Sequence, residues 1–249
     1  MCLILHRPTG VPIPPEYLER ASERNPDGWG IMSTNRGKIK ISRGIKPATF
    51  SRSLVSHGEA ELFVHFRLCT HGAINLKNTH PFSICGGRYA VMHNGVIPID
   101  CPDPAYSDTW HYCHTSLEPW LQANPAVFDD PIFTASIQEH VGQHNKLVIL
   151  RDDGQYRVVN PDSWCTRSGI WLSNSHSVEP ARSRLWGSSA LTTWDWRDSD
   201  DWDDGATPDS LDDLAGLDLD DLTRHVTDYP EDVARMIQSY FARADSRAY

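Results

Sequence analysis

Residues 61–72 read ELFVHFRLCTHG, an apolar run that ends in a cluster of polar residues. The first part of this run, Glu61–Arg67, is rich in residues that favour β-strands. A second run of the same kind, Arg88–His93, also ends in polar residues. Functional loops commonly lie where the strands of a rigid scaffold end, so we expect functional side chains at both strand ends.

More strands and several helices are expected on either side of these two runs. Turn residues at Asn35-Arg36-Gly37 and Asp152-Asp153-Gly154 predict two β-hairpins. The other strands are expected at Cys2–His6, Gly30–Thr34, Lys38–Ser42, Asn145–Leu150, Gln155–Asn160 and Gly169–Asn174. Helices are expected at Pro15–Arg24, Pro47–Ser56, Ser107–Gln122 and Pro131–Val141, the last two covering one face of a sheet.

Length and composition favour one large domain with an appendage. The chain has 249 residues, of which 39% are apolar and 22% charged, as is ordinary for a folded protein. The net charge of −10 comes from one stretch, because Asp195–Asp221 holds twelve Asp and one Arg and the rest is nearly neutral. We expect a main domain over 1–190, an acidic Trp-bearing connector over 191–229 and an amphipathic helix over 230–249.

The same properties argue against several classes of function. No basic patch indicates nucleic-acid binding, and no apolar run is long enough for a signal peptide or a membrane span. The six cysteines are scattered without a CxxC pair, which favours reduced thiols and a cytoplasmic protein. His111, Cys113 and His114 do not face one point on a helix, so neither a metal site nor a cofactor is expected.

Cys2 directly follows the initiator methionine. Removal of Met1 would leave a thiol and a free α-amine on the same residue. An α-amine titrates near ~7.7–8.0, so its neutral fraction can accept the thiol proton. The alternative is that Cys2 is a small apolar residue in a buried strand, and taken alone the residue favours this alternative.

Three clusters of residues further along the chain favour the catalytic interpretation of Cys2. They follow Cys2 in the order His65–Gly72, Asn78–Phe82 and His93–Ile97. Together with Asn25–Ile31 and with Ser107-Asp108-Thr109, they resemble the class II glutamine amidotransferases, which are N-terminal-nucleophile hydrolases. The match spans roughly Cys2 to Asn174.

The resemblance implies both a fold and a reaction. The fold would be α+β, a four-layer αββα sandwich of two antiparallel sheets with helices outside. In the reaction, Cys2 would attack the side-chain amide of glutamine, release ammonia and leave a γ-glutamyl thioester for water to hydrolyse to glutamate.

The resemblance also implies the oxyanion hole of this reaction. Asn94 through its side-chain amide and Gly95 through its backbone N–H would stabilise the tetrahedral intermediate. The alternative is an ordinary hairpin turn, for which Asn-Gly is the strongest short signal. Trp29 is expected in a loop that folds over bound glutamine, and His80 is left outside the catalytic set.

The substrate's α-carbon would be held by a second group of residues. Arg67 would bind the α-carboxylate, which suits the planar guanidinium fork, and Asp108 would receive the α-ammonium. Thr70 and His71 would help to hold the carboxylate. The alternatives are a surface salt bridge for Arg67 and helix N-capping for Asp108. Leu68 and Cys69 depart from the Trp and Ala common at these family positions.

The destination of the ammonia is expected to be another protein. Only about 75 residues follow Asn174, and they are too acidic and irregular for a second catalytic domain. We expect a stand-alone glutaminase domain that supplies a separate synthetase or transferase, with Asp195–Asp221 either a docking surface or a solvated linker. Two alternatives stay open: a γ-glutamyl hydrolase of a small-molecule conjugate, and a non-catalytic descendant that binds glutamine or regulates a partner.

Overall fold

A computed structural model describes residues 2–70 and 72–180 of the chain. The first structural unit ends at Glu179. The expected domain boundary at residue 190, the connector over 191–229 and the helix over 230–249 lie outside the described residues. Those three expectations therefore stay predictions.

The first sheet is antiparallel and has β1 near its centre. Its strands stand in the order β3-β2-β4-β1-β10-β9. The turn between β2 and β3 consists of Arg36 and Gly37, both with positive φ (51° and 74°), as a tight two-residue hairpin requires. The strands are β1 (Leu3–Arg7), β2 (Trp29–Asn35), β3 (Lys38–Gly44), β4 (Leu62–Phe66), β9 (Cys165–Arg167) and β10 (Ile170–Leu172).

The second sheet is also antiparallel, in the order β5-β6-β7-β8. Its strands are β5 (Phe82–Ile84), β6 (Tyr89–Asn94), β7 (Lys146–Arg151) and β8 (Tyr156–Val159). The helices are α1 (Pro15–Arg24), α2 (Phe50–Ser56), α3 (Asp108–Tyr112), α4 (Glu118–Ala123) and α5 (Pro131–Val141). Short helical turns are η1 (Pro47–Thr49), η2 (Leu76–Asn78), the π-helical η3 (Cys113–Leu117), η4 (Pro125–Asp129) and η5 (Pro161–Ser163).

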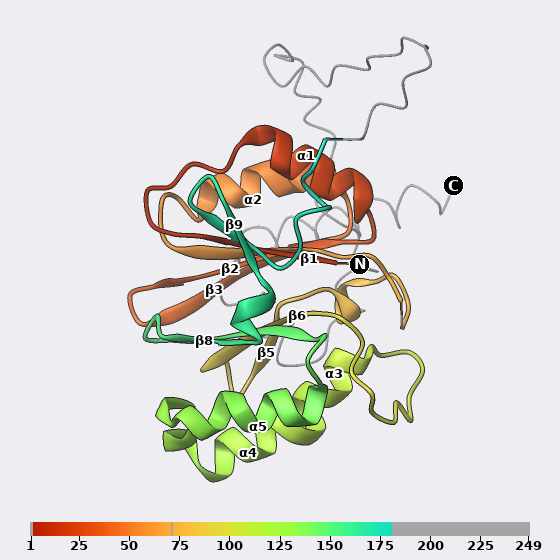
Figure 1. Ribbon diagram of the computed structural model, residues 1–249, viewed down its shortest axis with the longest axis vertical. Coiled ribbons are helices and arrows are strands. Elements are labelled where there is room, and N and C mark those ends of the chain that lie inside the picture. The colour runs from red at the N-terminus through yellow and green to blue at the C-terminus, as the bar shows by residue number, and fades with distance from the viewer. Residues whose placement is uncertain (1, 71, 181–249) are drawn as a thin grey trace, which may run out of the picture. The chain divides into compact units, whose positions relative to one another are not determined.

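Three apolar clusters separate four layers. One packs the first sheet against α1 and α2, one lies between the two sheets, and one packs the second sheet against α3, α4 and α5. Figure 1 shows the same order of layers, with α1 and α2 above and α4 and α5 below. The expected four-layer αββα sandwich is therefore confirmed.

Alternation along the strands decides which side chains face the space between the sheets. In β1, Leu3 and Leu5 pack on the helix side and Ile4 faces the second sheet. In β6, Tyr89 and Val91 pack on α3–α5, whereas Ala90 and Met92 face the first sheet. The same alternation, continued to the ends of the two strands, puts Cys2 and Asn94 on the inner faces.

Some expected elements differ from the structure. The helix expected over Ser107–Gln122 consists of α3, η3 and α4, because the backbone widens into one π-helical turn. The strands β5 and β9 were not expected, since three residues carry too little pattern to be recognised. Trp29 does not lie in a loop, contrary to the expectation. It is a buried residue of β2 whose ring packs on Phe50 of α2.

Candidate active site

Cys2 lies just before β1, and backbone groups of a neighbouring strand end hold its thiol. Its sulfur accepts a hydrogen bond from the Leu68 N–H at 3.2 Å and lies 3.3 Å from the Leu68 carbonyl oxygen. The Cys2 carbonyl accepts a hydrogen bond from Asn174 Nδ2 at 2.7 Å. The residue is therefore fixed at the N-terminal end of β1 by segments that follow β4 and β10.

The end of β6 meets the start of β1 between the sheets. Ser173 Oγ accepts hydrogen bonds from the Ile4 N–H and from Asn94 Nδ2, both at 2.8 Å. His65, the cross-strand partner of Ile4, donates from Nε2 to the His93 carbonyl at 3.0 Å. These contacts connect His93 and the Asn94 side chain to the first sheet near the beginning of β1.

Asn94 and Gly95 do not form a hairpin, because β6 is followed by a loop that leads to α3 and not by a paired strand. Gly95 has φ +148°, and a Cβ there would lie 2.1 Å from Asn145 Oδ1. Only glycine fits this position. The hairpin alternative from the sequence is therefore wrong, and Asn94-Gly95 instead forms a corner between β6 and the loop that leads to α3.

His93 holds this corner through hydrogen bonds on both of its ring nitrogens. Its Nε2 lies 2.8 Å from Asn145 Oδ1 and its Nδ1 lies 2.8 Å from Thr109 Oγ1. Asn145 uses its own Nδ2 to donate to the Val141 carbonyl, so its oxygen faces His93, which fixes the neutral tautomer with hydrogen on Nε2. Burial lowers the pKa of His93, although Asp108 acts in the opposite direction.

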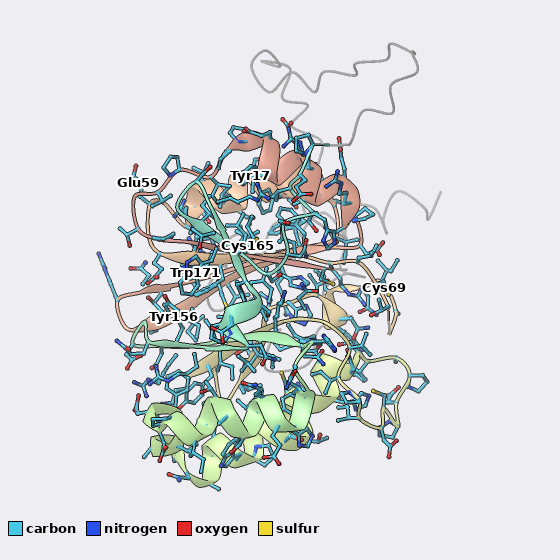
Figure 2. The ribbon with its side chains drawn as sticks, viewed as in Figure 1. Tyr17, Glu59, Cys69, Tyr156, Cys165 and Trp171 are labelled. Atoms are coloured by element: carbon cyan, nitrogen blue, oxygen red, sulfur yellow. The ribbon has the colours of Figure 1, made fainter. Side chains whose placement is uncertain are left out.

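Arg67 is the first residue after β4, and only 3% of it is exposed. Its Nη1 donates to the Ala73 carbonyl at 3.1 Å, and its Nη2 lies 3.3 Å from Cys69 Sγ. Burial of this kind contradicts the alternative of a surface salt bridge. Figure 2 shows Cys69 on the opposite side of the sandwich from Tyr156 and Trp171.

Asp108 begins α3 and connects this helix to the loop after Gly95. Its Oδ2 accepts a hydrogen bond from the Ile97 N–H at 2.7 Å, and its Oδ1 accepts one from the Thr109 N–H at 2.8 Å. The N-cap of α3 is Ser107, whose Oγ accepts from the Trp110 N–H at 3.2 Å. The capping alternative for Asp108 is therefore wrong, and the carboxylate is 6% exposed at the helix start.

Thr70 and His71 are the remaining residues expected to hold the substrate. Thr70 is exposed in the loop after Cys69, and His71 lies outside the described residues. Sequence reasoning missed Ser173 and Asn174 as contacts of the site. The only signal for them was their position at the end of an expected strand, where polar residues follow apolar ones.

Known proteins share part of this sequence. A glutamine–fructose-6-phosphate aminotransferase (isomerizing) from Sulfolobus acidocaldarius is 34% identical over 83 residues, which is 32% of this chain and 14% of that protein. The enzyme of the same name from Pyrococcus horikoshii is 35% identical over 89 residues, 33% of this chain and 14% of that protein. Over the matched residues the chain is similar to these glutamine-dependent aminotransferases, which supports its resemblance to the class II glutamine amidotransferases.

Other comparisons add less. No family model matches the chain. A solved glutamine phosphoribosylpyrophosphate amidotransferase from B. subtilis aligns with 69% of this chain and 41% of its own, at 14% identity and a TM-score of 0.38. This chain matches about one seventh of the length of its curated relatives, 14% in each case.

The Cys2 thiol of this protein has a raised pKa. Burial is the main cause, and it is partly offset by the Leu68 backbone hydrogen bond and by the charge of Arg67. A thiol with a raised pKa is protonated at neutral pH, so attack on a substrate needs a base that removes the proton.

Two further features of the described part of the chain concern metals and membranes. In residues 2–70 and 72–180 no three His, Cys, Asp or Glu side chains gather as a possible metal site. None of the helices in these ranges combines the length and apolar content needed to cross a membrane.

Proposed function

We propose that this protein is a glutamine amidotransferase that hydrolyses the side-chain amide of L-glutamine with Cys2 as the nucleophile. The observation that carries the proposal is that Ser173 Oγ joins the start of β1 to Asn94 at the end of β6. This contact supports the proposal that Cys2, two residues before Ile4, acts together with an oxyanion hole formed by Asn94 and Gly95. The names of the curated relatives support glutamine as the nitrogen donor.

The chemistry begins with the α-amine that removal of Met1 would expose. This amine takes the thiol proton while the Cys2 sulfur forms a bond to the side-chain carbonyl carbon of glutamine. The carbonyl oxygen becomes an oxyanion, which Asn94 Nδ2 and the Gly95 N–H stabilise. One such donor contributes about 2.7–4 kcal/mol to transition-state stabilisation.

Collapse of this intermediate breaks the carbon–nitrogen bond. The protonated α-amine gives its proton to the departing nitrogen, which leaves as ammonia, and a γ-glutamyl thioester remains. Water then attacks the thioester, with the same amine as base, and glutamate leaves with the regenerated thiol. In this scheme Cys2 alone forms the covalent bond and transfers the proton. Asn94 and Gly95 only stabilise the oxyanion.

Selection of the free amino acid belongs to the other pair of residues. Arg67 would pair with the α-carboxylate through its guanidinium group, and Asp108 would receive the α-ammonium. Thr70 and His71 are proposed as additional contacts to the carboxylate. Because Arg67 and Asp108 are both buried and carry opposite charges, a bound zwitterionic amino acid would pair with both of them and leave neither charge unpaired.

Ammonia is proposed to pass to a separate synthetase or transferase in the cytoplasm. Support comes from the composition of Asp195–Asp221, whose twelve Asp and interspersed Trp suit a docking segment. A pull-down with and without these residues distinguishes a docking surface from a linker, since an unchanged set of partners removes the docking role.

The Cys2→Ala substitution tests the proposed reaction. We expect wild-type protein with a verified Cys2 N-terminus to release ammonia from glutamine, and the variant to lose this activity at least about 1000-fold, because no other group replaces the nucleophile. The measurement is ammonia release, with intact mass to establish removal of Met1.

Three other results would change the interpretation. Equal rates in wild type and variant would end the enzymatic proposal. Retained Met1 in the native protein would favour a non-catalytic, glutamine-binding or regulatory protein. Faster cleavage of γ-glutamyl conjugates than of glutamine would favour a γ-glutamyl hydrolase.

A further inference from the structure

Asn78 is a fully buried side chain that joins two loops of the site. It ends η2 and has 0% exposure. Its Nδ2 donates to the Ala73 carbonyl at 3.0 Å and to the Ala105 carbonyl at 2.8 Å. Its Oδ1 accepts from the Ser107 N–H at 2.7 Å. One amide therefore holds together the loop after Arg67 and the loop before Asp108.

Each end of this amide is one step from a charged residue of the site. The Ala73 carbonyl that accepts from Asn78 also accepts from Arg67 Nη1, at 3.1 Å. Ser107, which donates to Asn78, is the N-cap of α3 and directly precedes Asp108. A shift of the Asn78 side chain would thus be transmitted to both charged groups.

The packing around Asn78 leaves little room for compensation. Gly72 has φ +74°, and a Cβ on it would lie 2.9 Å from Asn78 Nδ2 and 3.0 Å from the Ser107 nitrogen. The loop that carries Gly72 therefore passes directly over the amide. Neighbouring atoms at van der Waals distance cannot move independently, which makes the link between the two loops stiff.

Only an amide supplies the hydrogen bonds that this position uses. Two donors on nitrogen and an acceptor on oxygen match two carbonyls and one N–H. Aspartate has the same shape but no donor when ionised, so two carbonyl oxygens would face a negative charge. Serine lacks the length to reach both loops.

We propose that Asn78 is a positioning residue that sets the distance between Arg67 and Asp108, and thereby the preference for substrates that carry both an α-carboxylate and an α-ammonium group. The inference rests on the proposed glutaminase reaction. It concerns recognition of the amino-acid end of the substrate, and leaves the chemistry at Cys2 to Asn94 and Gly95.

Alkylation of Cys2 separates recognition from chemistry. A diazomethyl-ketone analogue of L-glutamine carries the α-carboxylate and α-ammonium groups, whereas iodoacetamide carries neither. In Asn78→Asp we expect alkylation of Cys2 by the analogue to slow about 100-fold, because the two charged groups are displaced. Alkylation by iodoacetamide is expected to stay at the wild-type rate. Mass analysis of the N-terminal peptide measures both rates.

Two variants accompany this experiment. Asn75→Ala is the matched control in the same turn, because it removes the hydrogen bond from the Asn78 N–H to Asn75 Oδ1 but leaves the Asn78 amide in place. It is expected to react with both reagents like wild type. Asn78→Ser introduces no buried charge and is expected to show the same selective loss if the aspartate variant does not fold.

The outcomes are separable. Unchanged alkylation of both Asn78 variants by the analogue would overturn the positioning role, and so would an equal loss with iodoacetamide, which would indicate general damage to the fold. If wild-type Cys2 shows no preference for the glutamine analogue, the proposed function fails and the inference fails with it.

Discussion

Gly95 is the residue at which backbone geometry most tightly constrains the proposed chemistry. Its φ of +148° and the 2.1 Å approach of a hypothetical Cβ to Asn145 Oδ1 leave no space for a side chain. Asn145, which occupies this space, is itself held by His93 and by the Val141 carbonyl.

The Gly95→Ala substitution is expected to abolish most of the ammonia release. The added methyl group forces the corner to move, which displaces one oxyanion donor and costs about 100-fold or more in kcat. Backbone strain should also lower the free energy of unfolding by about 1–3 kcal/mol. Steady-state kinetics and thermal unfolding measure the two effects.

Gly58→Ala is the matched control for Gly95→Ala. Gly58 also has a positive φ, of +60°, but a Cβ there meets no atom within 4 Å. We expect this control to lose stability through backbone strain and to keep the wild-type kcat. A wild-type kcat in Gly95→Ala would remove Gly95 from the proposed oxyanion hole.

At the scale of elements, the site depends on how three strand ends converge. Ser173 and Asn174, in the segment after β10, bond to the start of β1 and to the end of β6. The Lys146 ammonium at the start of β7 also donates to the Ser173 carbonyl. Both sheets thus contribute to one group of hydrogen bonds, which we call the polar junction. The Ser173 hydroxyl is its shared acceptor.

Ser173→Ala tests this junction. Loss of the hydroxyl leaves the Ile4 N–H and Asn94 Nδ2 buried without their acceptor, which should lower the free energy of unfolding by about 1–3 kcal/mol. It should also lower kcat, because the Asn94 amide is released. Urea unfolding and ammonia release give the two quantities.

Ser83→Ala makes the same truncation in β5. The Ser83 hydroxyl is buried and has no hydrogen-bond partner among the described residues, so its removal should leave both stability and kcat near wild type. Equal effects of the two serine substitutions would mean that Ser173 does not join the strands energetically.

Across the whole molecule, several histidines are buried in the neutral form. Burial lowers the pKa of His57 and of His65 to about 3, and lowers the pKa of His80 well below the ordinary value. In the unfolded chain these groups titrate near ~6.5. As the pH falls below about 6.5, the unfolded state binds protons that the folded state does not, so acidification destabilises the fold.

His57→Gln tests this linkage away from the proposed site. His57 accepts and donates hydrogen bonds with Ser33 Oγ at 2.7 Å and Ser42 Oγ at 3.0 Å, contacts that a glutamine amide can partly reproduce. Between about pH 6.5 and pH 4, the free energy of unfolding of wild type should fall more steeply than that of the variant. The difference is at most about 1.4 kcal/mol per pH unit.

The measurement is urea unfolding over this pH range. His140→Gln removes an exposed histidine and serves as control, with an expected pH dependence like that of wild type. If His57→Gln keeps the full pH dependence of wild type, protonation of buried His57 does not contribute to acid destabilisation.

The sequence by itself determined the order and type of most elements. Hydrophobic alternation and turn residues are local properties, so the strands around Glu61–Arg67 and Arg88–His93 and the hairpin at Arg36-Gly37 were predictable. The ordered motifs indicated the family, and with it the four-layer fold. Three-residue strands and the π-helical turn were not predictable, because they depend on neighbouring elements.

The contacts that assemble the site were decided by the tertiary structure alone. Cys2 and Asn174 are bonded across 172 positions of sequence, and Asn94 and Ser173 across 79. Ser107 and not Asp108 caps α3, because Asp108 is held by Ile97 from the preceding loop. Sequence patterns report periodicity within one element, whereas the partner of a polar side chain depends on which elements pack together.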